Sequence, residues 1–420
     1  MAPPGNPLLF YVGAVLCAYV AGQAIKGAAG VWWRRQEQRR RNDRDAEAFR
    51  QEAATAAESA RARLSRQLAW EGRRELVVSA VVDESPDVKS LYLIDPESRP
   101  LPRFLPGQYL TLALPAGPGG EEVVRCYSLS DRPHPEYYRL SIRRQDAPSD
   151  TPEAPPGVAS HWLHRHAKKG LRLACEAPRG AFFYNPGEPR PAVLIGAGVG
   201  VTPLVAMLEA ADHEQLRTAT HAVFGFRDGA AHLFADRVRE IAAANPLITT
   251  LFAYSSPGDE DQAGTHYDTA GRVTLETLRA ALPSSNFDFF LCGPPQMMQA
   301  LVPELLDWGV PEEAIHFEAF GPASVSLGGT AADKAIGSPV RFAPNEDPHV
   351  WDGECSSLLE MAEAIGVPLA SGCRAGNCGA CRVRVVEGKT INVRSPGTLT
   401  EDDECLACIS LPDGPVTIET

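Results

Sequence analysis

The sequence has little positive charge and little cysteine for its 420 residues. Forty Lys and Arg against 53 Asp and Glu give a net charge of −13, which argues against nucleic-acid binding because such proteins neutralise phosphates with basic faces. Ten cysteines, unevenly spaced, are too few for a disulfide scaffold and indicate cofactor chemistry in a reducing compartment. A hydrophobic fraction of 44% excludes both a wholly disordered chain and a polytopic membrane protein. The length predicts several domains.

One long uncharged run lies near the N-terminus. Residues 8–25 contain no charged side chain and as a helix would span about 27 Å, close to the thickness of a bilayer's hydrocarbon core. Five arginines follow between Arg34 and Arg41, and the positive-inside rule then places the rest of the chain in the cytoplasm. We therefore expect a single-pass transmembrane anchor in residues 1–33, in contact with the lipid bilayer, and a basic helical stalk in residues 34–72. A buried or cleaved segment is the alternative to the anchor, and a partly disordered tether is the alternative to the stalk.

Short β-type runs separated by Pro and Gly predict a small antiparallel barrel in residues 73–188. Within it, Arg125, Tyr127 and Ser128 form the pattern Arg-x-Tyr-Ser. A guanidinium suits a pyrophosphate, an aromatic face suits a flat heteroaromatic ring, and a hydroxyl suits a ring nitrogen. Further along, Gly157-Val158-Ala159-Ser160 precedes a helical segment, whose first backbone amides can hold phosphate oxygens. Each motif by itself is weak, since surface and packing residues often look the same.

The next region, residues 189–322, alternates apolar strands with helical stretches, which predicts a parallel sheet covered by helices on both faces. Its first strand continues into a glycine-rich turn, Gly196 to Pro203, of the kind that holds a diphosphate at a helix N-terminus. The turn departs from the common dinucleotide fingerprint, because Val201 replaces the last glycine. The last strand ends in Cys292-Gly293-Pro294, at the edge where such sheets bind ligands. A buried structural role is the alternative for this cysteine.

The order of these motifs resembles that of the ferredoxin-NADP⁺ reductase superfamily. The resemblance implies that Arg125 and Ser160 bind the flavin phosphates, that Tyr127 packs on the isoalloxazine, and that Ser128 hydrogen-bonds near its N5. It also implies a Greek-key barrel and FAD in preference to FMN.

The same resemblance places Cys292 against the nicotinamide, Phe320 over the flavin ring as a stacking gate, and Glu318 in proton traffic. The expected catalytic residues are therefore Ser128, Cys292 and Glu318. The other expected cofactor contacts are Arg143, Gly157, Val158, Ala159, Gly198, Gly200, Thr202, Pro203, Arg227, Gly293 and Pro294.

The charge after the strand-like run Ile248 to Tyr254 bears on the choice of nucleotide. The turn Asp259-Glu260-Asp261 would repel the 2′-phosphate of NADPH, which favours NADH as the donor. Arg227 is the main argument for NADPH.

The C-terminal region, residues 339–420, follows a Gly- and Ala-rich linker in residues 323–338 and contains the spacing of a plant-type [2Fe–2S] cluster. Three cysteines form C-x4-C-x2-C and a fourth follows after 26 residues. The expected ligands are Cys373, Cys378, Cys381 and Cys408. Structural zinc fits less well because it prefers paired C-x2-C knuckles. Cys405 is the alternative fourth ligand, but Cys408 stands where plant-type ferredoxins, which have a β-grasp fold, carry theirs.

The domain order flavin, nicotinamide, ferredoxin resembles that of phthalate dioxygenase reductase and its relatives. The resemblance implies that NADH reduces the flavin, that the flavin reduces the cluster, and that the cluster reduces an acceptor protein such as an oxygenase, hydroxylase or desaturase. The predicted anchor makes a membrane-associated acceptor the expected partner, and the net charge of −7 in residues 339–420 suits docking to a basic surface. A quinone-reducing NADH dehydrogenase and a redox scaffold of a membrane complex are the alternatives.

Overall fold

The structure is a computed structural model in which the chain divides into two units, residues 1–64 and 65–420. It describes residues 70–147, 156–185, 190–214, 218–319, 335–344, 347–372, 374, 376, 379–393 and 400–420. The expected membrane anchor and nearly all of the expected stalk lie outside these residues. Within the described ranges, every helix is too short or too polar to cross a bilayer.

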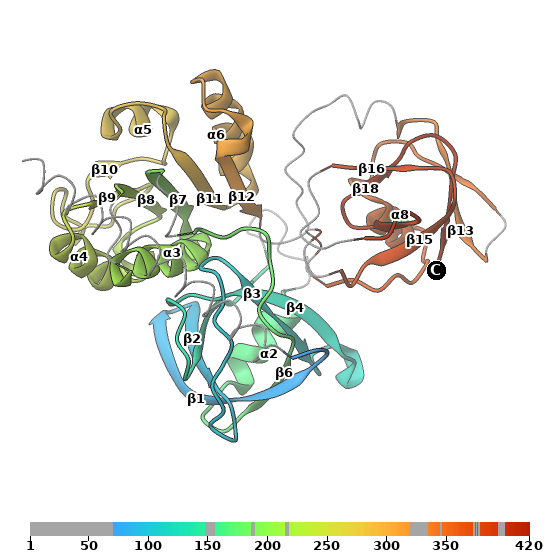
Figure 1. The fold of residues 1–420 in the computed structure, drawn as a ribbon, viewed down its shortest axis with the longest axis horizontal. Coiled ribbons are helices and arrows are strands. Elements are labelled where there is room, and N and C mark those ends of the chain that lie inside the picture. Colours follow the sequence, from blue (N-terminus) through green and yellow to red (C-terminus); the bar gives the residue numbers. More distant parts are fainter. Residues whose placement is uncertain are drawn as a thin grey trace, which may run out of the picture. The chain divides into compact units, whose positions relative to one another are not determined.

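The first described domain is a six-stranded antiparallel barrel with the strand order β4-β3-β6-β1-β2-β5 (Figure 1). Its strands are β1 (Arg74–Ser85), β2 (Val88–Ile94), β3 (Tyr109–Leu114), β4 (Val123–Ser128), β5 (Tyr138–Arg143) and β6 (Arg172–Cys175). An antiparallel bridge between Leu129 and Leu140 joins the two ends of this order, so the sheet closes on itself. The helix α2 (Val158–His166) buries Ala159 and Leu163 in the same core. The predicted antiparallel β domain is therefore confirmed.

One residue of the expected stalk packs on the barrel. The Trp70 indole donates a hydrogen bond to the Cys175 carbonyl oxygen at 3.1 Å and packs against the barrel core. Trp70 was expected in the stalk, but its large apolar ring is stabilised by burial on the barrel.

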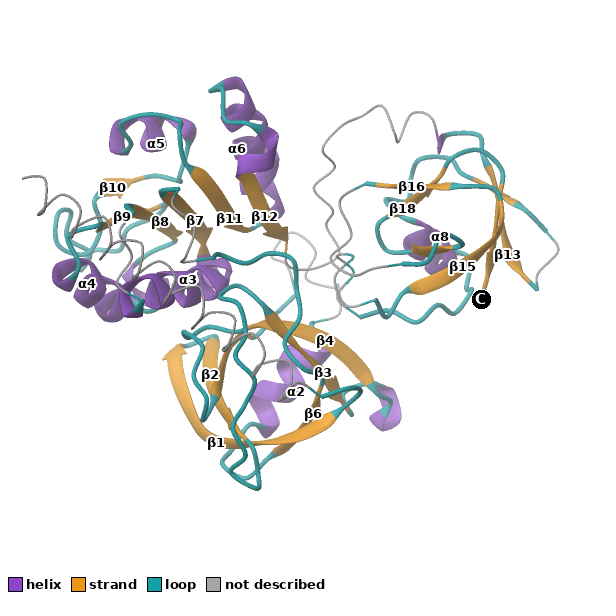
Figure 2. Ribbon diagram, in the orientation of Figure 1, coloured by secondary structure: helices purple, strands orange, loops and turns teal. Residues whose placement is uncertain are grey.

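The second domain is a six-stranded parallel sheet with the order β10-β9-β8-β7-β11-β12. Its strands are β7 (Ala192–Ala197), β8 (Thr220–Phe226), β9 (Ile248–Tyr254), β10 (Thr269–Ala270), β11 (Asp288–Gly293) and β12 (Ile315–Ala319). The helices are α3 (Val201–His213), α4 (Ala235–Ala244), α5 (Leu275–Ala281) and α6 (Pro295–Asp307). Figure 2 shows α3 and α4 on one face of the sheet and α5 and α6 on the other.

The sequence of β7 explains this two-faced covering. Leu194 packs into the core beneath α3 and α4, whereas its neighbours Val193 and Ile195 pack into the core beneath α5 and α6. A strand buried on both faces needs an unbroken apolar run, and β7 has one. The predicted parallel sheet is confirmed.

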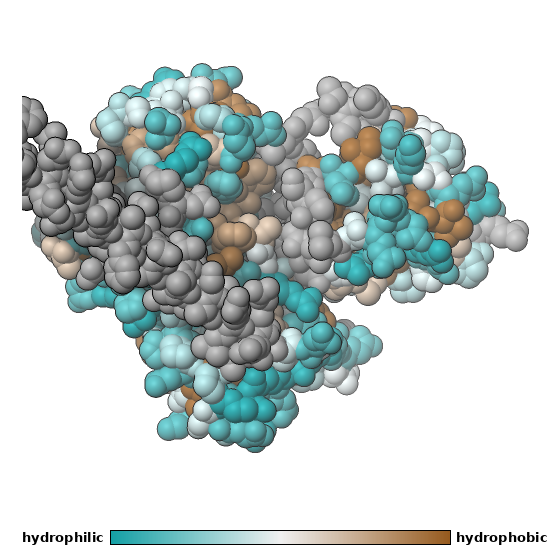
Figure 3. Space-filling view, viewed as in Figure 1, coloured by the Kyte–Doolittle hydropathy of each residue, from teal (hydrophilic) through white to brown (hydrophobic). Residues whose placement is uncertain are grey.

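The third domain contains a mixed five-stranded sheet with the order β14-β13-β19-β15-β17. Its elements are β13 (Pro339–Ala343), β14 (His349–Val350), α8 (Leu358–Ala364), β15 (Arg382–Glu387), β17 (Glu404–Leu406) and β19 (Val416–Glu419), with a separate pair β16 (Thr390–Asn392) and β18 (Ser410–Pro412). The Ser357 hydroxyl caps α8 by accepting a hydrogen bond from the Glu360 backbone N–H. On the face seen in Figure 3, this domain is mostly hydrophilic with hydrophobic patches between.

Residues just before the predicted boundary at 339 also pack on this domain. Ala335 is fully buried in its core, and the Gly337 N–H donates to the Trp351 carbonyl oxygen at 2.8 Å. Residues 335–338, at the end of the expected linker, therefore pack with this domain.

Candidate functional site

The three expected catalytic residues lie together where the barrel meets the parallel sheet. Ser128 ends β4 of the barrel, and its hydroxyl donates a hydrogen bond at 3.3 Å to the Glu318 carboxylate of β12. Glu318 is paired in register with Cys292 on the neighbouring strand β11. All three are buried, so the two domains enclose a small polar group of one hydroxyl, one thiol and one carboxyl.

The surroundings of Cys292 keep it neutral. Burial, with a smaller contribution from the charge of Glu318, raises the pKa of its thiol well above the ordinary value. A protonated thiol is a weak nucleophile, so the geometry favours a role as a compact wall beside a bound ring over covalent chemistry.

Ser160, one of the two expected flavin-phosphate residues, lies beside the loop that follows β5. The Gln145 N–H donates to the Ser160 hydroxyl at 3.1 Å, and the Gly157 N–H donates to the Gln145 carbonyl oxygen at 2.8 Å. A Cβ at Gly157 would lie 2.7 Å from the Gln145 Cβ, so this approach needs glycine. The first turn of α2, which includes Val158 and Ala159, is thereby fixed at the end of the strand that carries Arg143.

Arg125 and Tyr127 lie on one face of β4, because side chains two residues apart in a strand point the same way. Both are half-buried; Tyr127 packs against the barrel core, and the Arg125 guanidinium donates to the Val124 carbonyl oxygen at 2.8 Å. These positions fit a flat ring lying on a strand with a cation beside it, and their roles toward FAD stay predictions.

The glycine-rich turn packs directly on the end of β11. It is a short 3₁₀ turn, Gly198–Gly200, that continues into α3. A Cβ at Gly200 would lie 2.4 Å from the Cys292 carbonyl oxygen, and one at Gly293 would lie 3.2 Å from the Ala197 nitrogen. The Thr202 hydroxyl donates to the Val199 carbonyl oxygen at 2.9 Å and holds the first turn of the helix.

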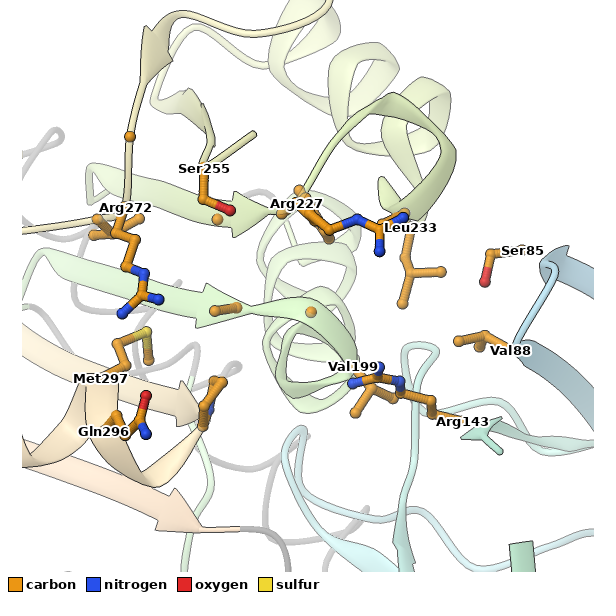
Figure 4. Close-up of a pocket in the computed structure, with 18 of the residues that line it drawn as sticks. Ser85, Val88, Arg143, Val199, Arg227, Leu233, Ser255, Arg272, Gln296 and Met297 are labelled. Atoms are coloured by element: carbon orange, nitrogen blue, oxygen red, sulfur yellow. The ribbon is translucent and has the colours of Figure 1, made fainter. Parts of the chain in front are cut away.

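A cavity of about 420 Å³ opens beside this turn. Figure 4 shows Arg143, Arg227 and Arg272 around it, contributed respectively by the barrel, by the chain after β8 and by the loop after β10. Among the expected nucleotide residues, Gly198, Arg227 and Pro294 line the cavity. Others lie in the turn, the first turn of α3 and the end of β11, next to the cavity wall: Gly200, Thr202, Pro203, Cys292 and Gly293.

The arginines of the cavity differ in how they are paired. Arg143, one of the expected cofactor contacts, forms an ion pair with Asp87 at 2.8 Å on the cavity wall. Although burial opposes it, hydrogen bonds from Ser85 and Arg143 lower the pKa of Asp87, so this carboxylate is charged at neutral pH. Arg227 pairs with Asp228 at 2.8 Å. Arg272 is exposed and makes no ion pair or hydrogen bond with any part of the chain that the structure describes.

The acidic turn Asp259-Glu260-Asp261 is not part of the cavity wall. The Asp261 carboxylate accepts hydrogen bonds from the backbone N–H groups of Gly258, at 2.7 Å, and Gly229, at 3.1 Å. The Asp261 carboxylate therefore stabilises the conformation of the loop in which it lies. The expectation of NADH drew on this turn, and the choice between NADH and NADPH stays a prediction.

Sequence reasoning missed several residues of the cavity, above all Asp87, Ser255, Arg272 and Met297. Arg272 follows β10, a strand of only two residues that has no detectable pattern in the sequence. Asp87 stands in the turn between two barrel strands, where an acidic residue is ordinary.

The C-terminal domain brings two of the expected cluster ligands together. The Sγ atoms of Cys381 and Cys408 are 3.1 Å apart, and the Gly376 N–H donates to the Cys408 sulfur at 3.2 Å. Cys405, the alternative ligand, is buried, and this burial raises the pKa of its thiol to about 11. Two converging sulfurs with a backbone N–H directed at one of them fit a [2Fe–2S] cluster. Cys373 and Cys378 lie outside the described residues, as does Phe320.

Comparisons with known proteins agree with this division of the chain. Residues 75–184 match the oxidoreductase FAD-binding domain, residues 194–302 the oxidoreductase NAD-binding domain, and residues 347–413 the 2Fe-2S iron-sulfur cluster binding domain. The chain is therefore an NAD(P)H-dependent flavin oxidoreductase with a [2Fe–2S] domain. Together, the three matches support the ferredoxin-NADP⁺ reductase superfamily.

Individual relatives cover different parts of the chain. It is 37% identical to a flavohemoprotein of Rhodopirellula baltica over 60% of its own length and 62% of the relative's, so it spans less than two thirds of that protein. The FAD/NAD-binding domain of a nitric oxide dioxygenase from Vibrio cholerae is 32% identical, with a TM-score of 0.53 over 60% of this chain and 100% of that one. Phthalate dioxygenase reductase shares the fold, with 20% identity and a TM-score of 0.51 over 83% of this chain and 98% of the other.

Proposed function

We propose that this protein carries electrons from NADH, through FAD and a [2Fe–2S] cluster, to an acceptor protein of the oxygenase type. The observation that carries the proposal is the buried contact between Ser128 of the flavin domain and Glu318 of the nicotinamide domain, next to Cys292. It places groups from both cofactor domains in one enclosed space beside a nucleotide-sized cavity. A bound flavin supplies the conversion of a two-electron hydride donor into single electrons for the cluster.

Side chains of the protein itself shape the enclosed space between the two cofactor domains and the cavity beside it. Ser128 holds the Glu318 carboxyl through its hydroxyl, and burial of all three side chains excludes water from the meeting point of the domains. Cys292 remains a neutral thiol and so adds bulk without charge. The arginines on the cavity wall attract the diphosphate that NADH and NADPH share.

The proposed acceptor is membrane-associated. Phthalate dioxygenase reductase, whose fold the chain shares, bears the name of an oxygenase system, which supports an acceptor of that type. The uncharged run in residues 8–25 and the arginines that follow support a tether that would confine encounters to the membrane plane, with the catalytic domains in the cytoplasm. The acidic cluster domain, at −7, suits a basic docking face on the acceptor.

Anaerobic titration of the purified protein tests the electron path. Stepwise addition of NADH is expected to bleach the flavin absorption and then the iron–sulfur absorption, with the number of electrons equal to the capacity of both centres. Dithionite reduction provides the reference for full bleaching. If NADH leaves both centres oxidised while dithionite reduces them, the proposal is wrong.

The choice of nucleotide has its own test at Arg272, the cavity arginine with no partner among the described side chains. If the 2′-phosphate of NADPH lies beside it, Arg272→Ala is expected to raise the KM for NADPH about tenfold, the loss of roughly one charged hydrogen bond, and to leave the KM for NADH within about twofold. Steady-state kinetics with ferricyanide as acceptor measure both. An equal rise for the two nucleotides would place Arg272 at the shared diphosphate instead.

A further inference from the structure

Two carboxyl side chains face each other across the boundary between the flavin and nicotinamide domains. Glu209 lies on α3 of the nicotinamide domain and is only 4% exposed. Asp131 lies in the barrel three residues after Ser128, and the Arg132 backbone N–H donates to its carboxyl at 2.7 Å and to that of Glu209 at 3.4 Å, so the two carboxyls lie side by side. Two carboxyls this close in a buried site are expected to share one proton, so that one of them donates a hydrogen bond to the other.

Neighbouring groups complete the contact. The Arg237 side chain of α4 donates to Glu209 at 3.1 Å, and the Arg132 backbone N–H approaches it at 3.4 Å. The Tyr137 hydroxyl donates to Asp131 at 2.9 Å. The titratable and charged groups facing the pair from all sides are Glu84, Tyr92, Arg132, Tyr137, Arg139, Asp212, Arg237 and Glu240.

The directions of the two pKa shifts favour Glu209 as the protonated partner at neutral pH. Burial, together with the hydrogen bond to Asp131 and the charge of Asp131, raises the pKa of Glu209 to about 8. Although burial opposes it, hydrogen bonds from Glu209 and Tyr137 lower the pKa of Asp131. One neutral acid therefore donates to one carboxylate, an arrangement expected for carboxyls that share a buried site.

The position of the pair in the fold links it to the reaction. The helix α3 that carries Glu209 starts directly after the glycine-rich turn Gly198–Gly200. The segment that carries Asp131 starts directly after Ser128, the barrel residue that contacts Glu318. Nearby, the Arg139 guanidinium of the barrel lies 4.6 Å from the centroid of the Phe234 ring at the start of α4. Two further contacts between the domains, Ser128 with Glu318 and Arg139 with Phe234, therefore accompany the pair of carboxyls.

We propose that Asp131 and Glu209 are positioning residues: the protonated Glu209 carboxyl donates to the Asp131 carboxylate and fixes the helix behind the nucleotide turn against the segment behind Ser128. The inference rests on the proposed function, because the alignment of the two domains matters only if hydride passes from the nucleotide to the flavin. It assigns the pair no contact with either cofactor. Ionisation of Glu209 replaces the hydrogen bond by two like charges and loosens the alignment.

The sign of the pH effect follows from the raised pKa. A carboxyl whose pKa is higher in the folded protein stabilises it fully below the ordinary value of 4.5, and this contribution is lost as the pH rises through about 8. Both the folded state and the alignment of the domains should therefore weaken on the alkaline side.

Amide variants of the FAD-loaded, full-length protein test the pair. In the wild type, the rate of ferricyanide reduction at saturating NADH is expected to fall about fivefold from about pH 7 to about pH 9.5, with a midpoint near 8. Glu209→Gln donates the same hydrogen bond at every pH, so its rate should stay within about twofold of the neutral value across this range. Asp131→Asn removes the repulsion and should likewise abolish the alkaline loss. Glu209→Ala removes the bond and should be about tenfold slower at all pH values.

A matched control lies close by. Glu240→Gln makes the same substitution at an exposed carboxyl that contacts Arg237 at 3.7 Å, and it should keep the wild-type pH profile. Thermal unfolding of the same proteins from about pH 6 to about pH 9.5 gives a readout that needs no turnover: the wild type should lose Tm on the alkaline side, and Glu209→Gln should not.

The possible outcomes distinguish the role of the carboxyl pair from the proposed function of the protein. If Glu209→Gln retains the full alkaline loss of both rate and Tm, the shared proton is refuted. If only the Tm profile changes, the pair stabilises the fold and the positioning role is refuted. If NADH reduces the flavin in none of the proteins, the proposed function fails, and the Tm profiles still decide whether the pair holds the proton.

Discussion

Replacing Cys408 with serine is expected to remove the visible iron–sulfur absorption and to stop electron delivery to a protein acceptor. Loss of an outer-shell partner of a metal ligand typically costs 10- to 100-fold in metal affinity, and loss of a ligand itself should cost at least about 100-fold. The Cys408 sulfur lies 3.1 Å from that of Cys381, so the variant removes one of two adjacent sulfurs. Iron and sulfide analysis with the visible spectrum of the purified protein measures the effect.

Cys405→Ser is the matched control, because Cys405 is equally buried and stands three residues away in the sequence. Burial raises the pKa of its thiol to about 11, so the thiol is neutral, and a serine hydroxyl, which is also neutral and slightly smaller, fits in its place. This variant should keep its cluster. A spectrum lost in Cys405→Ser and retained in Cys408→Ser would reverse the assignment of the fourth ligand.

Ferricyanide separates the cluster from the flavin in these variants. It accepts electrons directly from reduced flavins, so NADH-dependent ferricyanide reduction should remain within about twofold of the wild-type rate in Cys408→Ser, because the flavin and nicotinamide domains have cores of their own. Loss of this activity too would mean that the cluster domain is needed for the fold of the other two.

The strands and the motifs could be predicted from the sequence because each of them depends only on residues that are consecutive in the chain. The run Ala192 to Ile195 is apolar at every position, which suits a strand covered on both faces, and the structure buries all four side chains. The Arg-x-Tyr-Ser pattern likewise falls on a single strand, β4, and brings Ser128 to its end.

Features assembled from distant segments could not be predicted in this way. Glu209 stands among buried apolar residues of α3, and only the tertiary structure shows that its neighbour is Asp131 of another domain. Asp261 was expected to act on the nucleotide, but two backbone N–H groups of its own neighbourhood bind its carboxylate. Charge in a sequence indicates which interactions a side chain can make, and the fold decides which one it makes.

Gly200→Ala is expected to lower kcat/KM for NADH by about 100-fold, the order of loss that a 1 Å misplacement of a binding element can cause. The backbone of Gly200 has φ −63° and ψ −11°, which alanine adopts without strain, so any effect comes from the added methyl group. That methyl carbon would lie 2.4 Å from the Cys292 carbonyl oxygen and 2.6 Å from the Gly293 Cα. These are backbone atoms of β11, which is paired with β7 on one side and β12 on the other. The strand is held from both sides, so the turn must move.

Displacement of the turn shifts the first residues of α3, and with them the wall of the nucleotide cavity at Gly198. The fall in kcat/KM should therefore appear mainly as a higher KM for NADH. The flavin content and the photochemical reduction of the flavin should remain as in the wild type. Gly258→Ala is the control, because a methyl group there would meet only the Asp261 carboxylate, at an ordinary 3.6 Å. Steady-state kinetics of both variants with ferricyanide as acceptor measure kcat/KM for NADH. If this value for Gly200→Ala stays within about threefold of the wild-type value, the turn can move away from β11 without disturbing nucleotide binding. That result would contradict the prediction, which assumes that the turn is tightly packed against the strand.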